Sequence, residues 1–267
     1  DIIIGGAAGD TIRGNAGDDL ILGDEGTITL QGGVRMLVVS TNTATGGVDN
    51  IFGDNDNDVI VGGAYGDVIE GNLGDDLILG DSGRIDYVGG GSVDGILNQV
   101  LSTTEVVGGN DTINGNDGAD TIIGGAADDE IHGSTGNDVV LGDSGQLDYT
   151  DGDLRTIAST ASGVGGVDTV TGDDGSDIVI GGAAGDTLRG ELEYRTAARS
   201  DLVRVEAAKA ERGVRLRLRL APEVTGPGRP RVTFMARLDR TPRPERSSEI
   251  SQQFSVDDST DRQSGLV

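Results

Sequence analysis

The side chains best suited to chemistry are aspartates that recur every nine residues. In residues 53–81, GDNDNDVIVGGAYGDVIEGNLGDDLILGD, the residues Asp58, Asp67 and Asp76 each end a glycine-rich hexapeptide, and a short apolar segment follows each of them. Glycine reaches backbone conformations that turn several carbonyl groups inward, and the carboxylate adds negative charge. Calcium takes about six to eight hard oxygen ligands of these kinds. The spacing therefore predicts a series of cation-binding turns.

The nine-residue spacing extends over four blocks of the chain. We predict Ca²⁺ as the bound ion and the following fourteen aspartates as its side-chain ligands: Asp1, Asp10, Asp19, Asp49, Asp58, Asp67, Asp76, Asp111, Asp120, Asp129, Asp138, Asp168, Asp177 and Asp186. Any one of them could instead be an ordinary Asx-turn residue that needs no metal. So many in register favour metal binding.

A repeating unit of one tight turn and one short strand is typical of a parallel β-roll. We therefore expect an all-β fold, a parallel β-roll or β-helix solenoid, over residues 1–190. A longer repeat lies on top of it, because Gly-Gly-Ala begins at residues 5, 62, 124 and 181. Each long unit contains nonapeptides plus one insert, at about 24–45, 81–107 and 143–164. Alternation and β-branched residues predict strands or hairpins in these inserts.

The hexapeptides and the apolar residue two positions after each Asp resemble the RTX, or haemolysin-type, calcium-binding repeats, G-G-x-G-x-D-x-U-x with U a large aliphatic residue. The resemblance implies that each nonapeptide is half a coil, so that an ion lies between turns n and n+2 on the same edge of the roll. The implied pairs are Asp1/Asp19, Asp58/Asp76 and Asp120/Asp138 on a first edge, and Asp49/Asp67, Asp111/Asp129 and Asp168/Asp186 on a second edge.

The turns themselves alternate between two types, as two edges of one roll would require. First-edge turns begin with Gly and a polar residue, and second-edge turns read Gly-Gly-Ala. The second edge departs from the family pattern, because its fourth turn position holds Ala8, Tyr65, Ala127 or Ala184 in place of Gly. We therefore expect the first edge to bind calcium more firmly.

Side chains alternate along a strand, so the residues on either side of U point out of the roll. After first-edge turns these neighbours are apolar almost throughout, as in Leu20/Leu22, Leu77/Leu79 and Val139/Leu141. So large an apolar stripe does not face water in a soluble monomer. We predict that the inserts fold over it, and a partner chain is the alternative cover.

Composition divides the chain near residue 190. Residues 1–190 carry 34 acidic and five basic side chains, whereas residues 191–267 carry 12 acidic and 15 basic ones and all five prolines. Bound cations would relieve the self-repulsion of the first part, and its charge argues against binding nucleic acid. In the second part, alternation over 202–205, 214–220 and 232–238 predicts antiparallel strands. This β-rich tail is expected to be part of a small β-sandwich or partly disordered.

Several motifs look catalytic and are predicted not to be. Gly80-Asp81-Ser82-Gly83 recurs at 142–145 and resembles the nucleophile segment of chymotrypsin-like proteases, but the first repeat has Glu25 in place of Ser. The one histidine, His132, should face solvent on a strand, and a triad needs a base beside its nucleophile. The chain has no Cys. Residues 54–58 resemble the start of an EF-hand loop without its turn glycine or its bidentate acid.

We therefore expect a non-catalytic, calcium-binding β-roll module of a secreted or cell-surface bacterial protein, with a role in adhesion, as a scaffold or as a secretion aid, that folds on binding calcium. The alternatives are an accessory region of a secreted hydrolase whose catalytic domain lies outside this sequence, or a self-assembling surface-layer or fibre subunit. Expected partners are calcium ions and either a protein partner or a second copy of the chain that associates through the roll ends, with no nucleic acid and no membrane insertion. Since Asp1 already lies in a repeat, the sequence is expected to be a fragment.

Overall fold

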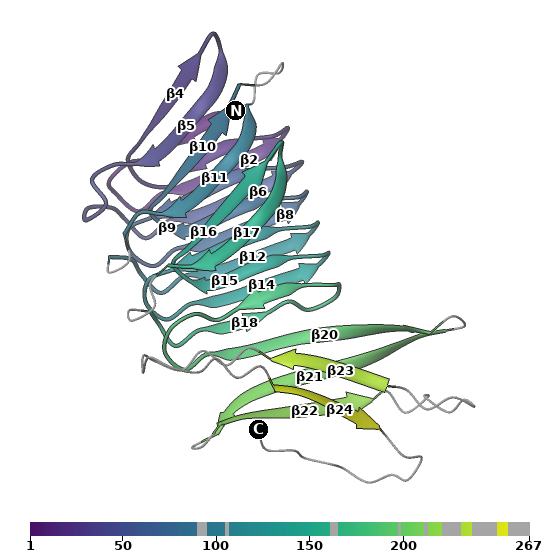
Figure 1. The fold of residues 1–267 in the computed structure, drawn as a ribbon. Coiled ribbons are helices and arrows are strands. Elements are labelled where there is room, and N and C mark those ends of the chain that lie inside the picture. The colour runs from purple at the N-terminus through teal and green to yellow at the C-terminus, as the bar shows by residue number, and fades with distance from the viewer. Residues whose placement is uncertain are drawn as a thin grey trace.

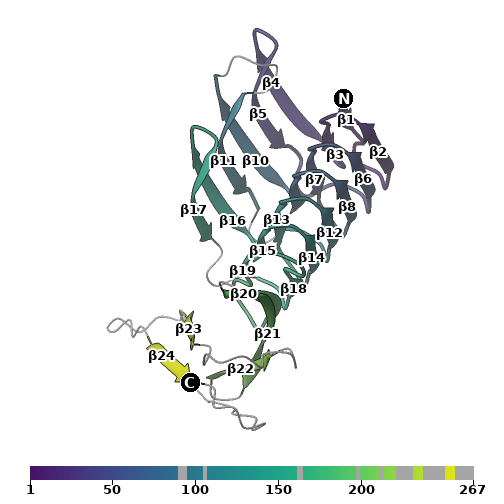
Figure 2. The same cartoon turned by 90° about the vertical axis from the view of Figure 1, so that its right-hand side faces the viewer.

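The computed structural model describes residues 1–89, 95–104, 107–160, 165–196, 199–210, 213–220, 231–236 and 250–255, and from residue 191 onward only the backbone. Every regular element in these ranges is a β-strand, so the all-β prediction is confirmed. The strands stack into a solenoid with a hairpin sheet along one side (Figures 1 and 2). No helix long and apolar enough to cross a membrane occurs in the described residues.

The strands that follow first-edge turns form one parallel sheet, which we call sheet A. In spatial order they are β1 (Ile2–Ile4), β3 (Leu20–Leu22), β7 (Val59–Gly63), β9 (Leu77–Asp81), β13 (Thr121–Gly125), β15 (Val139–Asp143) and β19 (Ile178–Ile180). Equivalent residues of successive repeats pair directly, as Ile21 does with Ile60 and Ile60 with Ile78. The register follows the repeat because a one-residue slip would turn every buried side chain to the other face.

The strands that follow second-edge turns form the opposite sheet, sheet B. In order they are β2 (Thr11–Ala16), β6 (Asn50–Asn55), β8 (Val68–Leu73), β12 (Thr112–Asp117), β14 (Glu130–Thr135), β18 (Thr169–Thr171) and β20 (Thr187–Thr196), all parallel. Between the two sheets lies a narrow core made of one aliphatic side chain from each repeat: Ile12, Ile21, Ile51, Ile60, Ile69, Ile78, Ile113, Ile122, Ile131, Val140 and Val170. These are the U positions of the repeats, as the alternation of side chains predicts.

The three inserts form three antiparallel hairpins that join edge to edge into a six-stranded sheet, sheet C. The hairpins are β4 (Gly26–Gln31) with β5 (Val34–Ser40), β10 (Gly83–Val88) with β11 (Ile96–Ser102), and β16 (Gly145–Thr150) with β17 (Asp153–Ser159). Sheet C lies beside sheet A, on the side of the roll away from sheet B (Figure 2).

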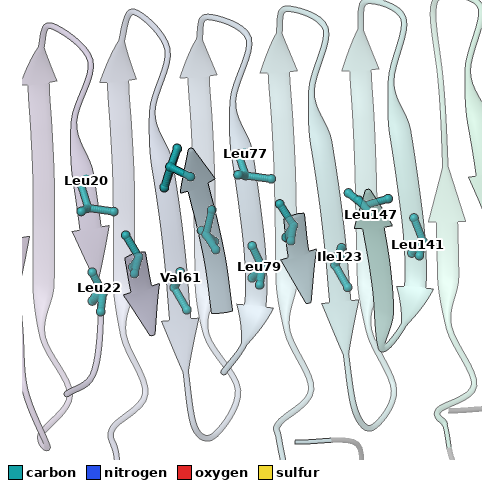
Figure 3. Packing of buried hydrophobic residues seen from close by; sticks show 12 residues of the cluster. Leu20, Leu22, Val61, Leu77, Leu79, Ile123, Leu141 and Leu147 are labelled. Carbon is teal, nitrogen blue, oxygen red and sulfur yellow. The ribbon is translucent and has the colours of Figure 1, made fainter. Parts of the chain in front are cut away.

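A second apolar core fills the space between sheets A and C. It joins the outward side chains of sheet A, among them Leu20, Leu79 and Leu141, to Ile85 and Leu147 of the hairpins (Figure 3). The prediction that the inserts cover the apolar stripe is confirmed, because Leu22, Leu79 and Leu141 are only 2%, 1% and 1% exposed. Burial of each such leucine stabilises the fold by about 1.5–3 kcal/mol. Because the hairpins cover these leucines, they contribute to the stability of the roll.

Beyond the nonapeptide grid, sheet B continues into the tail. The strand β20 runs on past residue 190 and pairs antiparallel with β21 (Arg199–Ala210), which pairs with β22 (Gly213–Leu220). A separate antiparallel pair joins β23 (Arg231–Ala236) to β24 (Ile250–Ser255). The strands predicted at 202–205 and 214–220 are therefore present, and the one predicted at 232–238 is described up to residue 236. The boundary near residue 190 and the β-sandwich stay predictions.

Candidate metal centre

The continuous turns that carry the aspartates have a left-handed residue at two of their six positions, except the turn before Asp10, where only Gly6 is left-handed. In first-edge turns the polar residue at position two has a positive φ, as in Asn15 (74°), Asp54 (75°) and Asn72 (76°), and position four is usually a glycine such as Gly74 (138°). Asn and Asp tolerate this conformation better than other residues that carry a Cβ. Gly and polar residues at these positions thus allow the chain to form a tight turn directly before each strand.

Second-edge turns reach a similar shape with a different distribution of glycines. Position two is a left-handed glycine, as in Gly63 (127°), and position four is left-handed without glycine at Tyr65 (73°), Ala127 (78°) and Ala184 (71°). Holding an ordinary residue in this conformation costs about 1–2 kcal/mol. The departure from the family pattern therefore leaves the turns formed but strained, and the weaker binding expected for this edge stays a prediction.

The fourteen aspartates fall into two continuous columns, one on each edge. The first-edge column is Asp1, Asp19, Asp58, Asp76, Asp120, Asp138 and Asp177, and the second-edge column is Asp10, Asp49, Asp67, Asp111, Asp129, Asp168 and Asp186. The backbone N–H of each aspartate donates to Oδ1 of the next one in its column. The distance is 2.8 Å from Asp58 N to Asp76 Oδ1.

All six aspartate pairs named from the sequence are neighbours in these columns. The sequence interpretation missed the neighbours that lie across an insert, such as Asp19 and Asp58, whose N and Oδ1 atoms are 2.8 Å apart. Asp76 and Asp120 are joined in the same way at 2.8 Å. Because each insert leaves the roll as a side hairpin, the columns continue as if the insert were absent.

The second carboxylate oxygen is where an ion would bind. In the described residues, eleven aspartates of the two columns have a buried Oδ2 without a hydrogen-bond partner: Asp19, Asp49, Asp58, Asp67, Asp76, Asp111, Asp120, Asp129, Asp138, Asp168 and Asp177. A buried carboxylate oxygen left without a partner is costly, so its repetition at so many equivalent positions is the arrangement expected of a series of cation sites. The residues present fit Ca²⁺.

The first glycine of each turn gives this oxygen a narrow space. A Cβ built on Gly14 would lie 2.5 Å from Oδ2 of Asp19 and 2.5 Å from the carbonyl oxygen of Gly53 in the next turn. Gly53 has the same surroundings, with Oδ2 of Asp58 at 2.3 Å and the carbonyl oxygen of Gly71 at 2.7 Å. Carboxylate and carbonyl oxygens thus converge between successive turns, in a space that a larger residue would fill.

An ion at these turns would need backbone carbonyls among its ligands. No group of three or more His, Cys, Asp or Glu side chains suited to a metal ion occurs in the part of the chain that the structure describes. Beside the first glycine of most turns, a column carboxylate oxygen lies near a carbonyl oxygen of the next turn. Calcium accepts such mixed oxygen ligands in flexible geometry, whereas zinc and other transition metals prefer imidazole or thiolate ligands.

Crowding of buried carboxylates shifts their acidity. Burial raises the pKa of Asp67 to about 8 and of Asp129 to about 9, and neighbouring carboxylates add to the shift while backbone N–H donors oppose it. Burial likewise raises the pKa of Asp76 and Asp120 to about 7. Burial and neighbouring charge disfavour ionisation of these groups, so a cation bound beside them would stabilise their charged form.

The motifs that resemble catalytic ones have structural places. Ser82 and Ser144 are 2% and 0% exposed at the bases of hairpins, and His132 lies against Thr171, Asp173 and Glu130. The stretch that resembles an EF-hand is a first-edge turn whose Asp58 belongs to the first-edge column.

Three further aspartates, which the sequence interpretation did not assign, lie where the hairpins leave the roll. Asp24, Asp81 and Asp143 are buried, and each accepts two backbone N–H groups from different segments. The signal for them is the motif Gly-Asp-x-Gly, which begins at residues 23, 80 and 142, directly before each hairpin.

The sequence model of one protein family, described as RTX calcium-binding nonapeptide repeat, matches the chain in four copies, at residues 1–27, 52–84, 107–146 and 162–193. The matched segments contain most of the two aspartate columns, and the segments between them contain most of the hairpins. No curated protein matches the chain.

Proposed function

Since residues 1–193 belong to the RTX calcium-binding nonapeptide repeat family, whose repeats bind Ca²⁺, we propose that this chain is a non-catalytic module whose two aspartate columns hold calcium ions between successive turns. The observation that carries the proposal is the series of buried, unpartnered Oδ2 atoms that repeats along both edges. Each bound calcium ion would be coordinated by carboxylate and carbonyl oxygens of neighbouring turns. Its positive charge would offset the negative charge of the carboxylates.

The role we propose is that of a rigid, calcium-dependent spacer or scaffold in a secreted or cell-surface bacterial protein. Sites with affinities of about 10⁻⁴–10⁻³ M, as in extracellular calcium modules, would be filled outside a cell and empty inside it. The acidic first part of the chain would then repel itself and stay extended before export, and would compact where calcium is available.

The proposal is tested by counting bound calcium ions in the full chain at saturation, by equilibrium dialysis. Asp58→Asn and Asp120→Asn keep the size of the side chain but remove a charge from the first-edge column, so each should lower the number of ions bound. The matched control is Asp153→Asn, which changes an exposed aspartate of β17 paired with Arg155. An equal ion count in all three variants and the unmodified chain would contradict the assignment.

A further inference from the structure

Three second-edge turns are interrupted by the hairpins. The chain leaves the first of them after Gly23-Asp24 and returns at Gly46-Gly47-Val48-Asp49. The others leave after Gly80-Asp81 and Gly142-Asp143 and return at residues 108–111 and 165–168. Without the hairpins, the joined residues read GDGGVD, GDGGND and GDGGVD, which are unbroken hexapeptides ending in a column aspartate, with glycine at position four.

The two halves of such a turn lie where one continuous turn would lie. In the leaving half, the backbone N–H of Asp24 donates to the carbonyl oxygen of Gly62 in the next second-edge turn at 3.2 Å. In the returning half, Gly47 lies directly over the preceding turn, since a Cβ on it would be 2.3 Å from the backbone nitrogen of Gly9. Asp49 then accepts from the N–H of Asp10 at 2.7 Å, in line with the column.

The space for an ion is divided between the halves. A Cβ on Gly23, in the leaving half, would lie 2.3 Å from Oδ2 of Asp49, in the returning half, and 2.5 Å from the carbonyl oxygen of Gly62. That Oδ2 is buried and has no hydrogen-bond partner in the described residues. An ion placed there would contact both ends of the hairpin.

The carboxylate of Asp24 joins the same two halves. Its Oδ1 accepts the N–H of Gly47 at 3.0 Å, and its Oδ2 accepts the N–H of Ala64 in the next turn at 2.6 Å. Asp81 repeats this with Gly109 and Ala126, and Asp143 with Gly166 and Ala183. Hydrogen bonds to a buried carboxylate are among the stronger ones in proteins, so these contacts fix how the halves meet.

In three of the four Gly-Gly-Ala turns this contact also involves the second glycine. A Cβ on Gly63, which has a φ of 127°, would lie 2.4 Å from Oδ2 of Asp24, and Gly125 and Gly182 are placed in the same way against Asp81 and Asp143. The long repeat of the sequence therefore has two coupled parts, an Asp at the base of each hairpin and a glycine that lets it approach.

We propose that each hairpin splits one calcium-binding turn and that Asp24, Asp81 and Asp143 are the positioning residues that hold its halves together. Calcium bound at Asp49, Asp111 and Asp168 then fastens the bases of the hairpins that cover sheet A. Metal binding on the second edge and docking of sheet C are thereby one coupled event. The inference rests on the proposed function, because it takes the columns as calcium sites.

The test is a double-mutant cycle. For each variant, the measured quantity is the calcium concentration at which binding is half-saturated. One background is the full chain, and the other lacks residues 25–45, so that Asp24 is bonded directly to Gly46. In the full chain, Asp24→Ala should raise that concentration about tenfold, since two hydrogen bonds to a charged group are lost. In the shortened chain the covalent link replaces the bond to Gly47 and leaves only the bond to Ala64 to be lost, so the same substitution should have a smaller effect, of about threefold or less.

Equal effects of Asp24→Ala in both backgrounds would overturn the proposal. They would show that Asp24 does not act by holding the two halves of the turn together. The control is Asp86→Ala, which removes only the pair with Arg84 on sheet C and should leave the calcium concentration unchanged. If no calcium binds in either background, the proposed function fails instead.

If the shortened chain does not fold, hydrogen exchange in calcium decides the question in the full chain. Asp24→Ala should expose the amides of Gly47, Asp49 and the β4–β5 hairpin, while the first-edge amides of Asp58 and Asp76 stay protected. Unchanged protection of the hairpin, or equal loss on both edges, would overturn the proposal.

Discussion

At the scale of single residues, we expect the position of an aspartate in its column to decide how much it contributes to calcium binding. Asp76 is buried between two neighbours, donating its N–H to Asp120 and accepting from Asp58. Asp186 is half-buried at the end of the second-edge column, where the N–H of Asp168 is 3.3 Å from its Oδ1. A central carboxylate can share an ion with the turn on either side.

We predict that Asp76→Ala raises the calcium concentration required for folding by about tenfold or more, and that Asp186→Ala raises it by about threefold or less, since a factor of ten corresponds to about 1.4 kcal/mol. Calcium titrations followed by circular dichroism compare the two. Equal shifts would show that neither place in the column nor the strained turn backbone of the second edge matters.

The acidity of the columns gives a prediction for the metal-free chain. Burial raises the pKa of aspartates such as Asp58 (about 6), Asp168 (about 7) and Asp67 (about 8) above the ordinary 3.8 of the unfolded chain. The folded state therefore binds more protons than the unfolded state, and its stability falls as pH rises from about 4 to 8. In excess chelator, β-structure measured by circular dichroism should be greater at pH 5 than at pH 8. No change, or the reverse order, would contradict these shifts.

At the scale of elements, the roll is stabilised by apolar cores on both faces of sheet A. Leu79 belongs to the outer core with Ile85 and Leu147, and a Cβ on Gly83 would lie 2.1 Å from its Cδ2, so hairpin and roll are closely fitted. In the proposed function calcium holds the edges of the roll, and the hairpins keep its apolar face out of water.

We predict that Leu79→Ala lowers the free energy of unfolding in saturating calcium by about 2–5 kcal/mol, as expected for a large-to-small change in a core. Leu30→Ala is the control, since Leu30 is 51% exposed on the edge strand β4 and should change the free energy by about 0.5 kcal/mol or less. Denaturant unfolding measures both. A small effect at Leu79 would mean that sheet C does not stabilise the roll.

The sequence predicts much of this fold because the repeat carries the information. The nine-residue period places Asp58, Asp67 and Asp76, and the alternation around Ile78 identifies the apolar stripe that the hairpins cover. The continuity of the columns across inserts was not predicted, because sequence distance hides that Asp19 and Asp58 are neighbours. The role of Asp24 was missed for a similar reason, since its partner Gly47 lies on the far side of a hairpin.

At the scale of the whole molecule, a strongly acidic chain with a net charge of −26 folds into a narrow solenoid whose two edges are lined by buried carboxylates. Neither apolar core offsets that charge, because both consist of uncharged side chains. Cations along both columns would balance it, so that folding and calcium binding become a single process.

The most direct test of this account is a calcium titration of the full chain, followed by far-ultraviolet circular dichroism and thermal melting at pH 7.5. We predict little β-signal and no cooperative melting in excess chelator, and a steep, reversible gain of both as calcium is added, with magnesium at the same concentration unable to replace it. A full β-signal with cooperative melting in excess chelator would contradict the claim that calcium in the aspartate columns holds the roll together.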